Sequence, residues 1–189
     1  MKNIILTAVV MLVLLTGGLF LYISSGSYDI SQLTPHNSLT KWMINTTKHK
    51  SIDKRMEGIE VPSNLTDTDM LALGFEHYDE MCVSCHGAPG EEPDELAKGL
   101  YPKPPKIYKR DGEDPREFFW IIKNGIKMTS MPAYGPTHDD AKIWAITAFV
   151  TKKLPKMNED EYHAWKTKYA DEEEDEDNAM KDSHQERQK

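Results

Sequence analysis

The chain has 189 residues, a formal net charge of −8 at pH 7 and only two cysteines. This length allows one domain with appendages or two small domains. The acidic balance argues against nucleic acid as a partner, and two cysteines are too few for a zinc site built from two cysteine pairs.

The first segment is long and apolar. No charged side chain lies between Lys2 and Asp29, and residues 4–23 are mostly apolar. As a helix this run spans about 30 Å, the hydrocarbon thickness of a bilayer. A cleaved signal peptide is the alternative, but its apolar core is usually only about 7–15 residues long. We therefore expect residues 1–25 to be an uncleaved membrane anchor with its amino terminus inside, which exports the rest of the chain.

Residues 26–63 are basic, with Lys41 inside a short apolar pattern that includes Leu39, Trp42 and Met43, and with three lysines and Arg55 after it. Ser38 begins this pattern, which predicts a short capped helix. A segment on the membrane surface would place Trp42 and the lysines among the lipid headgroups. We favour the alternative, a periplasmic linker that packs partly against the next domain.

Helical periodicity begins after the boundary at Val61-Pro62, and Thr66 or Asp67 is a suitable N-cap. Leu71, Gly74, Phe75 and Tyr78 then recur at intervals of three and four residues, which predicts one buried helix face. A glycine within that face is costly unless another element packs closely there. The pattern therefore predicts that a second helix crosses at Gly74.

The helix leads into Cys82-Val83-Ser84-Cys85-His86, the attachment pattern of a c-type haem. Each thiol can form a thioether bond with one haem vinyl group, and His86 can become the fifth iron ligand. Cys82 and Cys85 share one helix face, so both can reach one edge of the macrocycle. A thioredoxin-like pair would need alternating strands and helices, and a plain disulfide would leave His86 unexplained. The motif predicts one haem c, attached covalently through Cys82 and Cys85.

A turn follows at residues 87–90, and residues 99–107 contain three prolines. Proline fixes φ and cannot donate a backbone hydrogen bond, so this stretch is expected to be a stiff extended loop. The second nitrogen of an axial imidazole needs a hydrogen-bond acceptor, often a backbone carbonyl. We expect the carbonyl of Pro105 to supply it.

Asp114-Pro115 begins a short apolar helix that should end at Gly125. The loop beyond it holds Met131-Pro132, and a methionine fixed by the following proline suits a sixth iron ligand. A methionine is more often a flexible core residue, but the haem motif upstream favours ligation here. Met128 is the second candidate, and His77 and His138 are weaker ones.

The last predicted helix is capped within residues 137–140, carries an apolar run over 143–150 and stops at Pro155. Its aromatic face should meet the face that holds Gly74 and Tyr78. Residues 157–169 predict a short helical extension, and seven consecutive acids from Asp171 predict an acidic, disordered tail at 170–189. Such a tail can steer a basic redox partner or simply aid solubility.

These residues resemble a class I cytochrome c over residues 67–154. Within that class the chain is similar to membrane-anchored, single-haem cytochromes of proteobacteria, whose Trp-x-x-x-x-Gly-Ile-x-x-Thr-x-Met-Pro-Ala pattern appears at residues 120–133. The resemblance implies an all-α fold around one haem, with iron held by His86 and Met131, and single-electron transfer.

The expected domains are an anchor at 1–25, a periplasmic linker at 26–63, a cytochrome c domain at 64–156, the extension at 157–169 and the tail at 170–189. The expected function is a membrane-tethered electron carrier between redox donor and acceptor proteins. It would act at the bacterial cytoplasmic membrane, facing the periplasm, as a free shuttle or as the cytochrome subunit of a dehydrogenase or oxidase. No small-molecule substrate or catalytic residue is expected. A haem sensor or peroxidase-like protein with a displaceable sixth ligand is the alternative.

Overall fold

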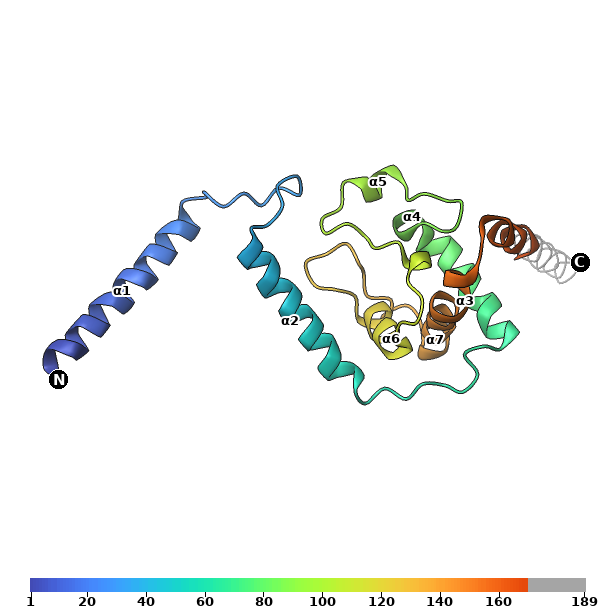
Figure 1. The fold of residues 1–189 in the computed structure, drawn as a ribbon, viewed down its shortest axis with the longest axis horizontal. Coiled ribbons are helices and arrows are strands. Elements are labelled where there is room, and N and C mark those ends of the chain that lie inside the picture. The colour runs from blue at the N-terminus through green and yellow to red at the C-terminus, as the bar shows by residue number, and fades with distance from the viewer. Residues whose placement is uncertain (170–189) are drawn as a thin grey trace, which may run out of the picture. The chain divides into compact units, whose positions relative to one another are not determined.

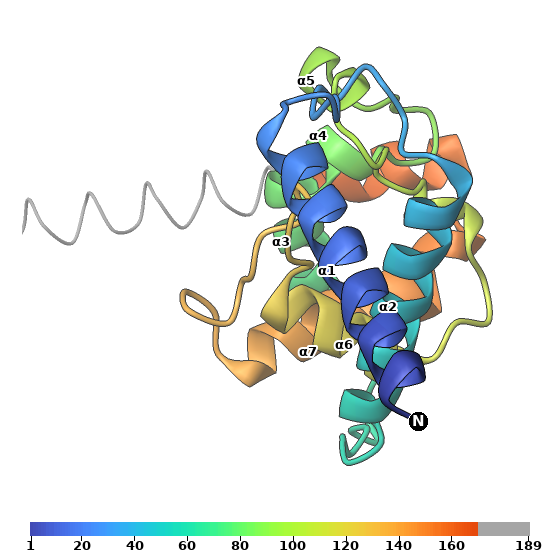
Figure 2. The ribbon, with the colours of Figure 1, turned by 90° about the vertical axis from the view of Figure 1, so that its left-hand side faces the viewer.

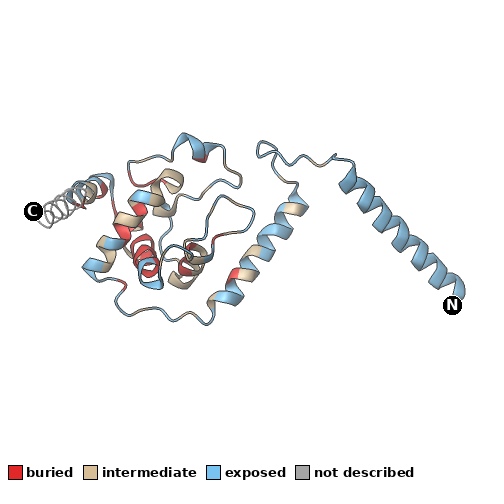
Figure 3. Cartoon of the chain, turned by 180° about the vertical axis from the view of Figure 1, so that it is seen from behind, coloured by how far each residue is buried: buried red, intermediate tan, exposed pale blue. Residues whose placement is uncertain are grey.

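The computed structural model describes residues 1–169, and the predicted acidic tail at 170–189 lies outside them. The chain divides into two units, Met1–His36 and Asn37–Lys189. The first unit contains helix α1 (Lys2–Ser24), which is exposed along its whole length (Figure 3). α1 is the one helix in the described part of the chain that is long and apolar enough to cross a membrane, and a signal sequence would pass the same test.

The chain between α1 and the second unit is folded on itself. The carboxylate of Asp29 accepts hydrogen bonds from the backbone N–H of Ser31 and the hydroxyl of Thr34. The Tyr28 hydroxyl and His36 Nδ1 are 2.5 Å apart, and the two rings are stacked. Residues 25–36 therefore form a compact turn rather than an extended tether.

The second unit begins with α2 (Ser38–Met56), which is longer than the short helix expected there. The Asn37 side chain caps it by accepting a hydrogen bond of 2.9 Å from the Thr40 N–H. Ile52 is buried, and α2 packs against α6 (Pro115–Asn124). Part of the segment expected to be a linker is thus a helix joined to the domain that follows.

The centre of the second unit consists of α3 (Thr68–Met81), α6 and α7 (Asp140–Ala148), which lie together in Figure 1 and in Figure 2. α3 crosses α7 at Gly74, as predicted. A Cβ added to Gly74 would lie 2.0 Å from the Ala145 carbonyl oxygen and 2.8 Å from the Phe149 Cβ. Only glycine allows the two helices to approach this closely.

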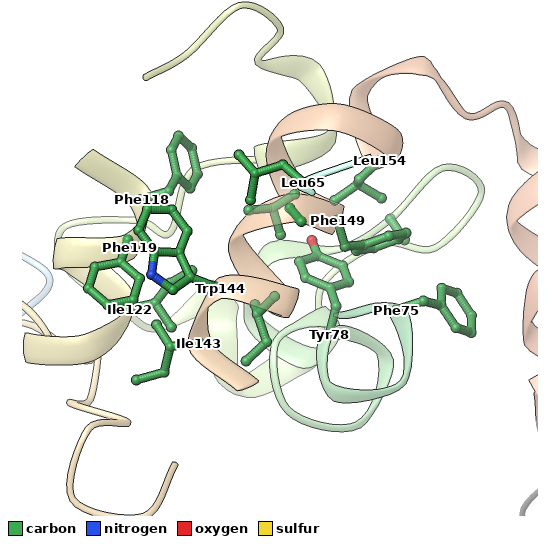
Figure 4. Packing of buried hydrophobic residues seen from close by; sticks show 14 of the residues in the cluster. Leu65, Phe75, Tyr78, Phe118, Phe119, Ile122, Ile143, Trp144, Phe149 and Leu154 are labelled. Atoms are coloured by element: carbon green, nitrogen blue, oxygen red, sulfur yellow. The ribbon is translucent and has the colours of Figure 1, made fainter. Parts of the chain in front are cut away.

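Aromatic and aliphatic side chains fill the space between these helices (Figure 4). Phe149 packs against Phe75 and Tyr78, with ring centroids 5.5 Å apart in both pairs. On the α6 side, Phe119 stacks on Trp144 at 4.2 Å. The predicted contact between the last helix and the Gly74–Tyr78 face is confirmed.

α6 has the predicted ends. The Asp114 side chain accepts a hydrogen bond of 2.9 Å from the Arg116 N–H, Pro115 is in the first turn, and Gly125 terminates the helix with φ +66°. The last helix differs from its prediction, because α7 ends at Ala148. A π-helical turn, η2 (Phe149–Lys153), and a 3-10 turn, η3 (Leu154–Lys156), continue it past Pro155.

Helices and turns account for the regular structure in residues 1–169, together with one isolated antiparallel bridge between Ala88 and Glu91. The predicted all-α fold is confirmed. The two short helices α4 (Val83–His86) and α5 (Glu95–Lys98) and the 3-10 turn η1 (Ile107–Lys109) lie between α3 and α6. Residues 159–169 are helical, and Asn158 caps them by accepting a hydrogen bond of 2.8 Å from the Glu161 N–H.

Candidate haem site

The two cysteines and the adjacent histidine lie where α3 ends and α4 begins. Cys82 terminates α3, and its carbonyl accepts hydrogen bonds from the N–H groups of Cys85 (3.1 Å) and His86 (2.9 Å). The resulting single turn holds all three side chains on a short, hydrogen-bonded piece of backbone. Gly87 ends this turn with φ +66°, a conformation that favours glycine.

His86 is oriented by the proline-rich loop. Its Nδ1 lies 2.8 Å from the Pro105 carbonyl oxygen, which is the contact expected from the sequence. A carbonyl can only accept, so Nδ1 carries the proton and Nε2 keeps a free lone pair. Burial lowers the pKa of His86, while the bond to Pro105 opposes this shift. The imidazole is therefore neutral at pH 7, the form that binds a metal.

The two cysteines are free thiols and do not form a disulfide. Burial, with a smaller contribution from Cys85, raises the pKa of the Cys82 thiol to about 12. Reactive redox cysteines have lowered pKa values, because the thiolate is the nucleophile. The environment of Cys82 thus disfavours a thioredoxin-like pair and suits a thiol that becomes a buried thioether.

Met131 is held in a tight loop after α6. The Ile126 N–H donates to the Met131 carbonyl (3.2 Å), and the Met131 N–H donates to the Thr129 hydroxyl (3.1 Å). A Cβ at Gly125 would lie 2.8 Å from the Met131 carbonyl oxygen, so glycine lets this loop return across the end of α6. The Met131 side chain is half-buried and packs against the same core as Cys82.

The other three candidate ligands are placed differently. Met128 is 94% exposed and adopts φ +59°, so its thioether points into solvent. His77 and His138 contact each other edge to face, with ring centroids 5.4 Å apart, on α3 and in the loop before α7. Of the two candidate methionines in the loop after α6, only Met131 is partly buried.

The sequence did not predict the role of Tyr78. Its side chain is fully buried, and its hydroxyl donates a hydrogen bond of 2.6 Å to the Gly87 carbonyl. This bond ties α3 to the residue that follows His86. Helical periodicity places Tyr78 on the buried face of its helix. No sequence pattern identifies the carbonyl to which its hydroxyl donates.

Helix 159–169 also holds this region. Lys166 bridges two carboxylates, Glu91 at 2.9 Å and Asp79 at 3.4 Å, and the Tyr162 hydroxyl donates to Asp79 at 2.7 Å. Glu91 pairs through the backbone with Ala88, so the turn after His86 is fixed to this helix. The spacing of Tyr162 and Lys166 shows that they share a helix face, but it does not identify their partners.

These residues fit a covalently attached haem. The free thiols of Cys82 and Cys85 can form thioethers, and His86 offers an unprotonated Nε2 whose orientation Pro105 fixes. Met131 could supply a soft sulfur from a constrained loop, and such a set of donors would suit cytochrome iron.

Comparison with known families agrees. A family model described as cytochrome C oxidase, cbb3-type, subunit III matches residues 69–150. The chain carries a c-type cytochrome domain. The matched range begins in α3 and ends in η2, so it includes the haem motif, the Pro105 loop and Met131. A search of curated proteins gave no match.

The all-helical arrangement around this motif is that of a class I cytochrome c. A c-type cytochrome domain binds haem and transfers electrons, and its presence indicates an electron carrier rather than a catalyst. α2 and helix 159–169 lie outside the matched range, although both pack against the cytochrome domain.

Proposed function

We propose that this protein is a membrane-tethered, single-haem cytochrome c whose iron is held by His86 and Met131. It passes single electrons between respiratory redox proteins. The haem is attached through Cys82 and Cys85, and His86 is oriented by the Pro105 carbonyl. The observation that carries the proposal is the contact of 2.8 Å between His86 Nδ1 and Pro105, which prepares Nε2 for an axial ligand.

The constrained Met131 loop supports a closed sixth position. A thioether opposite histidine stabilises ferrous iron relative to harder ligands, which suits an electron carrier. A sensor or a peroxidase-like protein needs a displaceable sixth ligand. The Met131 backbone is instead held by hydrogen bonds to the Ile126 N–H and the Thr129 hydroxyl, and by its close approach to Gly125.

Absorption spectroscopy of the purified haem protein tests the ligands directly. We expect a low-spin c-type spectrum with the weak far-red band of methionine bound to ferric iron, and no reaction of the reduced protein with carbon monoxide. Met131→Ala should lose the far-red band and bind carbon monoxide. Met128→Ala is the matched control, because its exposed side chain should leave both properties unchanged.

A high-spin wild-type spectrum or rapid binding of carbon monoxide would overturn the proposed ligation. Loss of the far-red band in Met128→Ala, but not in Met131→Ala, would assign the sixth position to Met128. Covalent attachment is checked separately, since thioether-bound haem stays with the denatured chain and is lost in Cys82→Ser, Cys85→Ser.

The apolar helix α1 supports the proposed location, which is the outer face of the bacterial cytoplasmic membrane. Its 23 residues span about 35 Å, enough to cross the hydrocarbon core. An uncleaved anchor predicts that the mature protein keeps residues 1–25 and stays in the membrane fraction after carbonate washing. Recovery of a soluble chain that starts near Gly26 would instead show a cleaved signal peptide.

Co-purification would distinguish a free shuttle from a subunit of a dehydrogenase or oxidase.

A further inference from the structure

We infer that the outer face of α2 rests on the anionic surface of the lipid bilayer. Because α2 packs on the cytochrome domain, this contact would set the orientation of the haem relative to the membrane. The inference rests on the proposed membrane anchoring, and the experiment below separates the two.

The first turns of α2 expose an apolar cluster. Leu39, Trp42, Met43 and Ile44 are each about half exposed or more, with Trp42 63% exposed. Contiguous exposed apolar groups on a domain mark a surface that binds a membrane or another protein. Tryptophan is the residue that most favours the boundary between lipid headgroups and hydrocarbon.

The same helix is strongly basic within an acidic chain. It carries five basic side chains and one acidic one, a net charge of +4, whereas the whole chain has −8. Those five are Lys41, Lys48, Lys50, Lys54 and Arg55. Amphipathic helices with aromatic and aliphatic anchors and basic flanks bind anionic bilayers.

α2 packs on the cytochrome domain through one side, and its opposite side stays exposed. Ile52 is 3% exposed and marks the inner side, where α2 packs on α6. At about 100° per residue, Lys50 and Lys54 lie about 160° around the helix from Ile52, Leu39 about 140° and Met43 about 180°. Trp42 and Ile44 lie about 80° from Ile52, at the two flanks of the helix. The remaining basic residues, Lys41, Lys48 and Arg55, lie within about 60° of Ile52. The helix therefore uses one side to hold the domain, and its opposite side carries two apolar residues, Leu39 and Met43, and two lysines, Lys50 and Lys54.

The short connection between α1 and α2 favours the lipid bilayer as the partner that covers the exposed side of α2. Only residues 25–37 separate the end of α1 from the start of α2. The hydrogen bond between Tyr28 and His36 shortens this connection further, because it closes most of it into a turn. A helix joined so closely to a membrane anchor meets lipid at a high effective concentration.

Fluorescence quenching by brominated lipid tests this contact in the full-length haem protein. The protein is placed in nanodiscs of phosphatidylcholine and phosphatidylglycerol, with or without bromine on the acyl chains near the headgroup. The signal of Trp42 is the difference between wild type and Trp42→Phe. We expect brominated lipid to remove most of this signal, and to remove less of it in nanodiscs of phosphatidylcholine alone.

A charge reversal tests the electrostatic part. Lys50→Glu with Lys54→Glu should restore much of the Trp42 emission in brominated nanodiscs. Lys98→Glu with Lys103→Glu, on the exposed α5 and the loop after it, changes the charge equally and should leave the quenching as in wild type. An unchanged haem spectrum shows that each variant is folded.

Two results would overturn the inference. Trp42 emission that brominated lipid does not reduce, in a protein that resists carbonate extraction, would refute the α2 contact and leave the anchor intact. Emission shielded from both brominated lipid and acrylamide in water would show that protein, not lipid, covers the surface. Release of the chain by carbonate would refute the anchor alone, and quenching by brominated vesicles would still decide the role of α2.

Discussion

The hydroxyl of Tyr78 and the carbonyl of Gly87 form a buried hydrogen bond beside the proposed iron ligand His86. Burial of a polar group without a partner costs about 1–3 kcal/mol, because the group loses its hydrogen bonds to water. The bond therefore favours one position of the backbone that follows His86. This links a residue in the middle of α3 to the position of the imidazole.

Tyr78→Phe should lower the free energy of unfolding of the haem protein by about 1–3 kcal/mol, because the Gly87 carbonyl loses its partner. Denaturant titration monitored by far-UV circular dichroism measures this loss. Tyr28→Phe is the matched control, since it removes a tyrosine hydroxyl outside the cytochrome domain. Equal stability of Tyr78→Phe and wild type would show that water or a shifted donor replaces the bond.

His77 should make stability depend on pH. Its Nε2 is the one buried side-chain nitrogen or oxygen in residues 1–169 that has no hydrogen-bond partner. Burial, with nearby His138 and Lys142, lowers the pKa of His77, and Glu80 opposes the shift. The folded protein therefore binds this proton less strongly than the unfolded chain does. Stability is full above the unfolded pKa of about 6.5 and falls as the pH drops through it.

We expect wild type to lose more free energy of unfolding between pH 7.5 and pH 5.5 than His77→Gln does. Urea titrations at several pH values measure the difference. His49→Gln, which removes an exposed imidazole on α2, is the control and should follow wild type. Parallel pH dependence of His77→Gln and wild type would assign the effect to other groups.

At the scale of single elements, sequence patterns predicted helices well where caps and periodicity agree. The Asp114 cap, the Gly125 terminus and the crossing at Gly74 all follow from local rules, and each is present. The contact between His86 and Pro105 was predictable because the chemistry of an axial imidazole requires an acceptor. Met131 could be ranked above Met128 because Pro132 follows it, whereas the exposure of Met128 became visible only in the structure.

Other elements escaped prediction because their stability comes from partners distant in sequence. The π-helical turn at Phe149–Lys153 has no periodic signature, since the apolar run continues through it. α2 extends well beyond its apolar start, and the packing of Ile52 on α6 contributes to its stability. Local periodicity cannot reveal a contact between segments more than 60 residues apart.

Gly74→Ala should be severely destabilising, because the new Cβ would meet the Ala145 carbonyl oxygen at 2.0 Å and α3 would have to separate from α7. We expect a loss of about 3 kcal/mol or more in the free energy of unfolding. Gly58→Ala is the same change at a glycine whose Cβ meets nothing within 4 Å, and it should shift stability by less than about 1 kcal/mol. Thermal unfolding of both variants measures the contrast. Similar midpoints would mean that the crossing can relax at little cost.

Helix 159–169 should be an integral part of the cytochrome domain although the family match ends at residue 150. Phe75 on α3 contacts three rings of this helix at centroid distances of 5.4–5.6 Å: Tyr162, Trp165 and Tyr169. Lys153 also lies over the Trp165 ring, 5.0 Å from its centroid. Removal of the helix would expose Phe75 and the buried faces of α3 and η2.

A chain that stops after Met157 should therefore lose at least about 3 kcal/mol of unfolding free energy, the cost of uncovering buried aromatic side chains. The matched control stops after Ala170 and removes only the acidic end, so it keeps the described contacts of residues 159–169 with the cytochrome domain. Guanidinium titration of the two shortened chains compares them. If both were as stable as wild type, the aromatic contacts would be unimportant for the domain.

At the scale of the whole molecule, charge and hydropathy divide the chain into parts with different surroundings. α1 is uncharged after Lys2, α2 carries +4, and residues 171–189 carry nine acidic and three basic side chains, a net −6. Residues 57–170, which lie between them and include the cytochrome domain, carry 20 acidic and 14 basic side chains, a net −6. Long-range electrostatic attraction of a basic partner would therefore depend on the domain as well as on the acidic end of the chain, and would weaken as salt is added.

Because the chain divides into two units, we expect the second unit to fold without the first. A chain that begins at Asn37, exported through a cleavable signal, lacks α1 and the turn at residues 25–36 but keeps every described contact within the second unit. It should bind haem covalently, remain in solution and show the full-length spectrum. A chain that begins at Ser63 also lacks α2 with its buried Ile52, which uncovers the facing part of α6. It should keep the spectrum but lose about 2–3 kcal/mol of unfolding free energy, since the burial of one large aliphatic side chain and its contact surface is lost. Thermal unfolding followed at the haem band compares the two. Equal midpoints would show that α2 adds nothing to the stability of the cytochrome domain, whereas loss of haem from the shorter chain would make α2 part of the minimal fold.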